Sequence, residues 1–146
     1  MVTFNITVTK RIQIASVLFT GEQMNSLGHS TIEAMKRRWA QGLDVQDQPA
    51  APLAAGYARR KQRLGARPIP DLSLSGQMQA ALGVQIAEPG RCRIGFSDQR
   101  SILKAYANHQ RRRQIGISDN DVRAVAPAAA QFLTENIRSA LRSVAA

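Results

Sequence analysis

The sequence predicts an α+β fold in which a small antiparallel sheet, made of an N-terminal strand and a central hairpin, packs against three helices. Three observations lead to this prediction. Residues 83–87 and 92–96 alternate apolar and polar side chains on either side of a Pro-Gly turn, and residues 2–9 alternate in the same way. Three other segments carry apolar residues at helical spacing. A lone hairpin is marginal, so these helices must cover its apolar face, and 146 residues suit a single domain spanning residues 1–146.

The first predicted helix follows the N-terminal strand. Residues 10–19 fit either a strand or the start of a helix, and the pattern leaves both open. Thr20 and Gln23 form a capping box that predicts the start of a long N-terminal helix, and Gly42 is expected to end it. The basic residues of its last turns suit the negative end of the helix dipole: Lys36, Arg37 and Arg38. Its apolar stripe comprises Met24, Leu27, Gly28, Thr31, Ile32, Met35 and Trp39.

A proline-containing loop is predicted over residues 43–56, because its two prolines prevent a continuous helix. Residues 57–63 read as a basic helical turn that ends at a glycine. Ser75 is expected to cap a short helix over residues 77–82. These elements lead directly into the hairpin.

In the hairpin, residues 88–91 supply the turn, since proline presets one dihedral angle and glycine permits a positive φ. The alternation places Val84 and Ile86 together on one arm. On the other arm it groups Cys92, Ile94 and Phe96. Cys92 is the only cysteine, so no internal disulfide can form, and its strand position favours a small buried hydrophobe over a reactive thiol.

After the hairpin, Ser97 or Asp98 is expected to cap a central helix that runs to about Gln110. Its predicted inner face comprises Ile102, Leu103, Tyr106 and Ala107. Residues 114–117 suggest a short strand. Residues 118–121 start a C-terminal helix, in which Pro127 implies either a restart or a kink. The apolar positions of this helix are Val122, Val125, Ala126, Ala129, Phe132, Leu133, Ile137, Ala140 and Leu141.

Charge is the one extreme property of the chain. Lys and Arg total 20 against 10 acidic residues, a net charge of +10, which favours an anionic partner such as nucleic acid or an acidic protein. Aromatic residues make up only 5%, so base stacking is poorly supplied. The candidate contacts with a partner or with DNA are the clustered cations Arg59, Arg60, Lys61, Arg63, Arg111, Arg112 and Arg113.

The sequence does not suggest an enzyme. It contains no Walker loop, nucleophile elbow, dinucleotide fingerprint or His-Glu-x-x-His motif, and we expect no catalytic residue, metal or cofactor. His29 and His109 lie in different predicted helices without carboxylates at matching spacing. Asp119 and Asp121 read as helix-capping residues. No apolar run is long enough for a membrane span and no secretory signal is recognisable, so we expect synthesis in a cytosol.

The order of motifs from residue 44 to about residue 123 resembles the phage virion morphogenesis (tail-completion, or neck) family of Mu-type and related tailed phages. A proline-rich segment at residues 47–53 is followed by a basic turn and then by a segment at the family's Thr-Gly-x-Leu place. The later segments look like the family's strand, central segment and Leu-Ser-x-x-Asp signature. The matching motifs are Tyr-Ala-Arg-Arg-Lys at 57–61, Leu-Ser-Leu-Ser-Gly-Gln-Met at 72–78, Arg-Ile-Gly-Phe at 93–96, Ala-Tyr-Ala-Asn-His-Gln at 105–110 and Gln-Ile-Gly-Ile-Ser-Asp-Asn-Asp at 114–121.

This resemblance implies a structural virion protein of the head-to-tail interface. Such a protein forms a homo-oligomeric ring, of six- or twelve-fold symmetry, that joins the capsid connector to the tail around the DNA channel. The implied partners are the portal or connector proteins on one side and tail-tube or tail-terminator proteins on the other, with nonspecific contact to genomic DNA and no membrane. The implied location is the neck of the virion, after assembly in the host cytoplasm. Charge alone favours an alternative, a small basic nucleic-acid-binding regulator.

Overall fold

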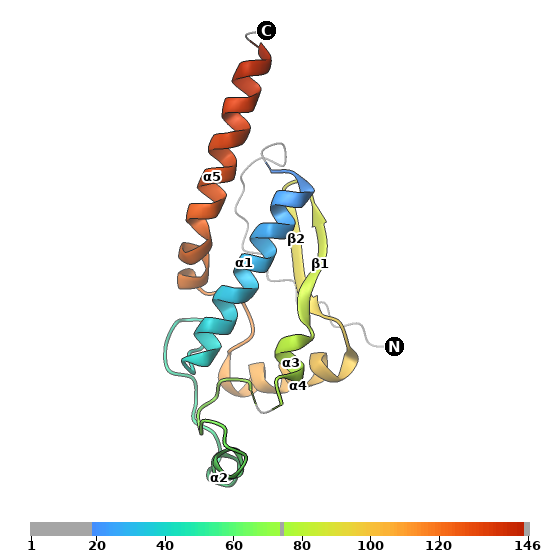
Figure 1. Cartoon of the computed structure of the whole chain (residues 1–146). Helices are drawn as coiled ribbons and strands as arrows, with labels where there is room; N and C mark the ends of the chain where they lie inside the picture. The colour runs from blue at the N-terminus through green and yellow to red at the C-terminus, as the bar shows by residue number, and fades with distance from the viewer. Residues whose placement is uncertain (1–18, 74, 145–146) are drawn as a thin grey trace.

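The computed structural model describes residues 19–73 and 75–144 and confirms the predicted α+β class (Figure 1). Helix α1 lies between a two-stranded antiparallel hairpin on one side and the last helix on the other, and α4 crosses the lower end (Figure 1). The predicted strand at residues 2–9 lies outside the described residues. The elements are α1 (Gly21–Ala40), α2 (Ala55–Arg63), α3 (Gln77–Ala80), β1 (Leu82–Glu88), β2 (Arg91–Phe96), α4 (Gln99–Arg112) and α5 (Asp119–Val144).

Both predicted ends of α1 are confirmed. The backbone N–H of Gln23 donates to the Thr20 hydroxyl at 3.2 Å, and the Thr20 N–H donates to the Gln23 side chain at 3.0 Å. At the other end Gly42 adopts a φ of +71°, which glycine reaches without the clash that a Cβ atom would cause. The buried face of α1 contributes Ile32, Met35 and Trp39 to the core, which Met78, Leu82, Ala105 and Ile115 complete.

The hairpin has its turn at the predicted position, with Gly90 at a φ of +71°. Its register, however, contains a β-bulge between Val84 and Ile86, which the strict alternation did not foresee. The extra residue reverses the facing of the residues after it, so Ala87 and not Ile86 shares the face of Val84. The Cα partners that show this are Val84 with Ile94, Ile86 with Arg93, and Ala87 with Cys92.

The short α3 and the inner face of α4 differ from prediction. Ser75 does not cap α3: the helix begins after Gly76, at a φ of +71°, without a side-chain cap, and ends at Ala80. Helix α4 is capped by Asp98, as predicted, but it buries Ser101 and Ala105. Three of the four predicted inner residues are exposed, Leu103 (54% exposed), Tyr106 and Ala107, while Ile102 is half-buried. The side of α4 that faces the core is therefore formed by small residues, and Ala105 belongs to the core cluster.

The predicted strand at residues 114–117 is instead an irregular buried connector, because its polar backbone groups bond to side chains of α1. Helix α5 then starts with a reciprocal cap, as predicted: the Asp121 N–H donates to the Ser118 hydroxyl, and the Ser118 N–H to the Asp121 carboxylate, both at 3.0 Å. The helix continues through Pro127 without a restart. It runs antiparallel to α1 and extends beyond the start of α1 (Figure 1).

At Gly28, α1 and the hairpin approach each other closely. A Cβ atom there would lie 2.5 Å from Cys92 Sγ and 2.7 Å from a Val84 methyl group, closer than real contacts allow. The Cys92 thiol is therefore a packing group, and its partial burial raises the pKa of the thiol.

We expect Gly28→Ala to lower the free energy of unfolding by about 1–2 kcal/mol, although alanine is normally the better helix former, because overpacking outweighs the propensity gain of about 1 kcal/mol. Urea unfolding followed by circular dichroism measures this. Gly56→Ala in α2 is the matched control, since a Cβ atom added there would meet nothing within 4 Å, and it should be neutral or stabilising. A Gly28→Ala protein as stable as the wild type would contradict the close approach.

Asp98 predicts a pH dependence of stability. Hydrogen bonds from the Ser101 hydroxyl and then from its backbone N–H, at 2.8 Å, lower the pKa of this carboxyl below its ordinary value. A folded pKa below the unfolded one means that the stabilisation is present above the unfolded pKa and is lost as pH falls through the folded pKa. Unfolding curves from about pH 5 to about pH 2 should show the wild type losing stability relative to Asp98→Asn, whose amide still caps but does not titrate. Parallel curves would rule the linkage out.

Candidate anion-binding surface

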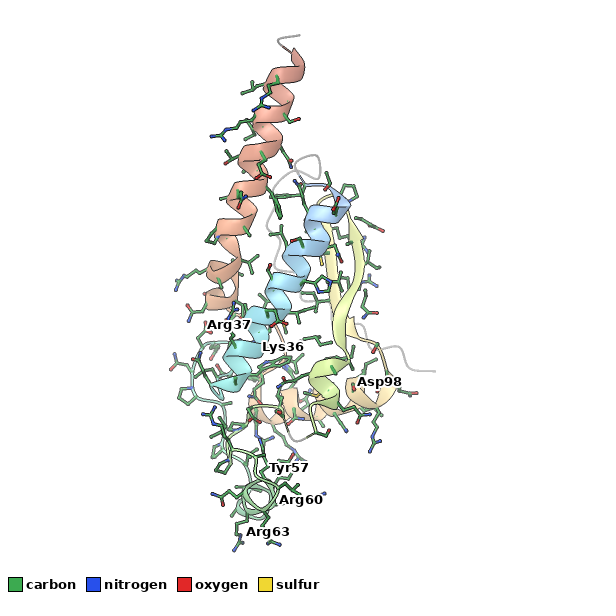
Figure 2. All side chains as sticks on the ribbon, viewed as in Figure 1. Lys36, Arg37, Tyr57, Arg60, Arg63 and Asp98 are labelled. Carbon is green, nitrogen blue, oxygen red and sulfur yellow. The ribbon has the colours of Figure 1, made fainter. Side chains whose placement is uncertain are left out.

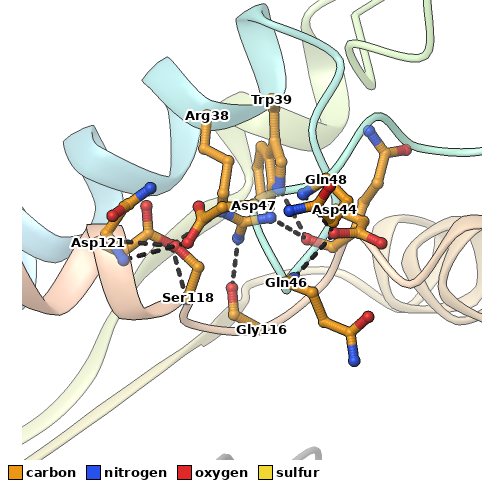
Figure 3. A network of polar contacts seen from close by, with 11 residues as sticks. Arg38, Trp39, Asp44, Gln46, Asp47, Gln48, Gly116, Ser118 and Asp121 are labelled. Carbon is orange, nitrogen blue, oxygen red and sulfur yellow. Dashed lines mark hydrogen bonds and ion pairs between the residues drawn. The ribbon is translucent and has the colours of Figure 1, made fainter.

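The lower end of the molecule is organised by the buried guanidinium of Arg38, which is only 4% exposed (Figure 3). Its Nε donates to the Asp121 carboxylate at 2.9 Å, and Nη2 donates to the Gly116 carbonyl at 2.6 Å. Nη1 and the neighbouring Trp39 indole both donate to the Gln114 carbonyl, at 3.2 and 2.8 Å. These bonds join the end of α1 to the connector and to the start of α5. The helix-dipole role expected for Arg38 therefore accounts for little of what this side chain does.

The predicted loop is confirmed over residues 43–54, whereas Ala55 and Gly56 already belong to α2. Aspartates order this loop. Asp44 accepts the N–H groups of Gln46 and Gln48 at 2.8 and 3.0 Å, and Asp47 accepts the Asn120 N–H at 3.2 Å. The loop is thereby fixed against the start of α5, and α2, which follows it, lies at the lower end of the molecule.

Lys61, one of the predicted contact residues, is a structural cation and points inward. It is 2% exposed, and its ammonium group donates to the Ile69 carbonyl at 2.9 Å and to the Asp71 carboxylate. Asp71 also accepts the Ser73 N–H at 2.9 Å. This buried ion pair holds α2 against residues 69–73, so Lys61 is not accessible to a partner.

The three arginines of α2 face away from this anchor. At about 100° per residue, Arg59, Arg60 and Arg63 fall within an arc of about 100° on the side of the helix opposite or lateral to Lys61. All three are exposed, and Figure 2 shows Arg60 and Arg63 on the outlying helix at the bottom of the molecule. The inward lysine thus sets the direction in which the arginines project.

Of the three arginines at the end of α4, one bonds within the chain and two are exposed. Arg112 is half-buried and bonds to the Ala51 carbonyl at 3.1 Å and to the Asn108 side chain at 3.3 Å. Arg111 and Arg113 are exposed. Arg113 ends the helix at a φ of +47°, and its carbonyl accepts the Val45 N–H at 2.9 Å. The structure therefore brings the predicted cations of α4 to the same end as α2.

Two exposed arginines that clustering did not single out also lie here. Arg37 is on the last turns of α1, and Arg67 donates to the Ala40 carbonyl at the end of α1, at 3.0 Å. Four nearby carboxylates are already engaged within the chain: Asp44, Asp47, Asp71 and Asp121. Asp71 and Asp121 are buried in ion pairs, whereas Asp44 and Asp47 accept backbone N–H groups and are half-exposed, so the exposed guanidinium groups outnumber the surface carboxylates of this set. We call this surface the basic end and define it as Arg37, Arg59, Arg60, Arg63, Arg67, Arg111 and Arg113.

The chemistry that the basic end supports is anion binding. Guanidinium groups donate several hydrogen bonds in a planar fork that matches phosphate and carboxylate. A cavity of about 250 Å³ lies between α2, the segment around residues 69–76 and α4, but it carries no convergent acid and base; its lining includes Tyr57, Lys61, Leu72, Met78 and Lys104. Among the described residues, no group of three or more His, Cys, Asp or Glu side chains could hold a metal ion.

Comparison of the chain with family models, curated proteins and solved structures found no match. Within residues 19–73 and 75–144, no helix combines the length and the apolar character that crossing a bilayer requires.

The anchor of α2 can be tested with Lys61→Met, which keeps the apolar stem and leaves the Asp71 carboxylate buried without its cation. We expect a loss of about 3 kcal/mol at the anchor. Amide hydrogen exchange should show α2 and residues 69–73 losing protection before the rest of the chain.

Arg63→Met is the matched control, because it removes an exposed cation from the same helix. It should leave the exchange of α2 unchanged. Adding Asp71→Asn to Lys61→Met should restore part of the protection, since no unpaired charge then remains buried. Equal effects of the Lys61 and Arg63 substitutions would show that the ion pair does not anchor the helix.

Proposed function

We propose that this chain is a structural protein of the phage head-to-tail interface, a neck or tail-completion protein that forms a ring between the capsid connector and the tail. The proposal starts from the order of motifs between residues 47 and 121. The feature of the structure that supports it best is the basic end, which combines exposed arginines with carboxylates that are already engaged inside the chain. Such a surface suits a channel through which DNA passes without its sequence being read.

The mechanism is docking and electrostatics. Phosphates along DNA would exchange their counterions for arginines of the basic end, which gives contacts that are nonspecific and sensitive to salt. The hydrogen bonds of Arg38 join α1 to residues 114–117 and to the start of α5. They would keep the ends of these elements in fixed positions when a neighbouring protein binds. Exposed apolar side chains on α4 and α5, among them Leu103 and Leu141, leave surface for such neighbours.

The alternative function is a small basic nucleic-acid-binding regulator, which the net charge favours. A regulator reads base edges and prefers one sequence, whereas a channel protein binds every duplex alike. Mass measurements also separate the two, because a neck protein should form complexes with connector or tail proteins.

We expect the dilute chain to bind double-stranded DNA without sequence preference. Its affinity for DNA should fall steeply between about 50 and 200 mM salt. Replacing Arg59, Arg60, Arg63, Arg111 and Arg113 by Gln should make the slope of log K against log salt less negative by about 0.9 for each arginine that contacts phosphate. Fluorescence anisotropy with duplexes of unrelated sequence measures both the slope and the preference.

A control variant with the exposed Arg93 and Arg100 replaced by Gln removes charge from the hairpin and the start of α4. It should change the slope little. A preference of about 10³-fold or more for one duplex, in the range of specific DNA-binding proteins, would favour the regulator and count against the neck proposal.

A further inference from the structure

The outward side of α4 carries apolar side chains that the fold leaves uncovered. The helix buries Ser101 and Ala105. At about 100° per residue, Leu103, Tyr106 and Ala107 lie on the opposite side, within an arc of about 100°. All three are exposed, Leu103 by 54% and Tyr106 by 43%. The apolar spacing that predicted an inner face therefore marks a surface that the described residues leave open.

Two cations border this apolar surface. Arg100 lies three residues before Leu103 on the helix. Lys104 lies three residues before Ala107, so the two cations form a row along one edge of the surface. Arg100 is exposed and Lys104 is half-buried. We call these two cations, together with Leu103, Tyr106 and Ala107, the α4 face.

Few carboxylates of the chain lie near the α4 face. Residues 99–118 contain no acidic residue, and neither do residues 72–87, which include the helix α3 packed against α4. Asp98 caps α4, where it accepts the Ser101 N–H at 2.8 Å and lies within electrostatic reach of Lys104. One carboxylate thus stands at one end of the face, and the face as a whole remains cationic.

The combination of apolar and cationic groups identifies the class of occupant. Duplex DNA offers phosphates to the cations but no apolar group that would cover Leu103. Residues 1–18 contain no acidic residue, and a second copy of the chain carries the same net charge of +10, which opposes association at low salt. A protein segment with carboxylates beside apolar side chains matches both parts of the face.

We propose that the α4 face docks an acidic amphipathic segment of a different protein. Apolar side chains of the segment pack on Leu103 and Ala107, and its carboxylates pair with Arg100 and Lys104. The inference deepens the proposed docking role, on which it rests, by naming the chemistry of the neighbour and its place on the chain. The face includes no arginine of the basic end, so DNA and the segment occupy different surfaces.

The probe is a displayed library of random peptides about four helical turns long, selected on the full chain. A basic chain attracts any acidic peptide, so each selected peptide is measured separately by fluorescence anisotropy against matched variants. The proposal requires peptides that carry carboxylates and, three or four positions apart, apolar residues, and whose binding depends on the α4 face.

For such peptides, Arg100→Gln with Lys104→Gln should raise the Kd about tenfold or more. Arg59→Gln with Arg63→Gln removes the same charge from α2 and should change the Kd little.

The apolar part of the α4 face has its own matched pair of variants. Leu103→Gln should raise the Kd about tenfold, because the segment then no longer buries a leucine. Leu141→Gln alters another exposed leucine, on α5, and should leave the Kd unchanged. Circular dichroism checks that all variants are folded.

Four outcomes would overturn the proposal. The first is a selection whose peptides all depend on the α2 arginines, or bind the α4 face without carboxylates. The second is a single-stranded oligothymidine whose affinity falls with the α4 substitutions, because the face would then bind nucleic acid. The third is self-association of the wild type, in sedimentation velocity, that Leu103→Gln abolishes. The fourth is protection of Leu103 from hydroxyl radicals in the free chain, which would show that the chain itself covers the face.

Failure of this inference is distinguishable from failure of the proposed function. The Arg100→Gln with Lys104→Gln variant should keep the salt slope of the wild type for duplex DNA, since neither residue belongs to the basic end. That slope, and the mass of the chain with connector and tail proteins, test the proposed function whether or not an acidic peptide binds the α4 face.

Discussion

The buried guanidinium of Arg38 is the interaction on which the lower half of the molecule depends. Removing an arginine and an aspartate from water costs several kcal/mol per ion, so the pair with Asp121 is sustained only because the other donors of Arg38 are also satisfied. The carbonyls of Gln114 and Gly116 accept those donors. Residues 114–117 have no regular structure, so no neighbouring strand pairs with these carbonyls. The Arg38 side chain supplies the hydrogen-bond donors that such a strand would provide.

A second buried cation, Lys61 of α2, is likewise stabilised by acceptors from an irregular segment. Lys61 is satisfied by a carbonyl and a carboxylate from residues 69–71, and it holds a helix that lies apart from the body in Figure 1. The two buried pairs consume carboxylates at the same end at which the exposed arginines gather. Each pair removes one cation together with one carboxylate from the surface, so the basic character of that end comes from the arginines that stay exposed.

Much of the fold could be predicted from local patterns. The cap at Thr20, the stop at Gly42, the hairpin turn, the Asp98 cap and the start of α5 all depend on residues within four positions of each other, so the sequence carries the signal directly. The errors have a different origin. The bulge beside Ile86 and the small inner face of α4 are set by how closely other elements approach, and no spacing within the segment records that.

The candidate site shows the same division. Clustering found five exposed arginines of the basic end, but it also included Lys61 and Arg112, whose side chains bond within the chain. A run of cations does not reveal which member faces the interior, because that depends on partners outside the run. Lys61 is held by Asp71, and Arg112 bonds to Ala51. Arg37 and Arg67 were missed for the reverse reason, since α1 and the segment after α2 meet only in the folded chain.

The burial of Lys61 also explains why the arginines of α2 act as one surface. A helix of nine residues that carried four cations around its circumference would present no preferred side. Turning one of them inward fixes the rotation of the helix about its own axis, and the remaining three then project together. Weakening the anchor would leave their charge unchanged but release their common direction. Any partner that depends on several arginines at once would lose affinity, whereas one that senses only net charge would not.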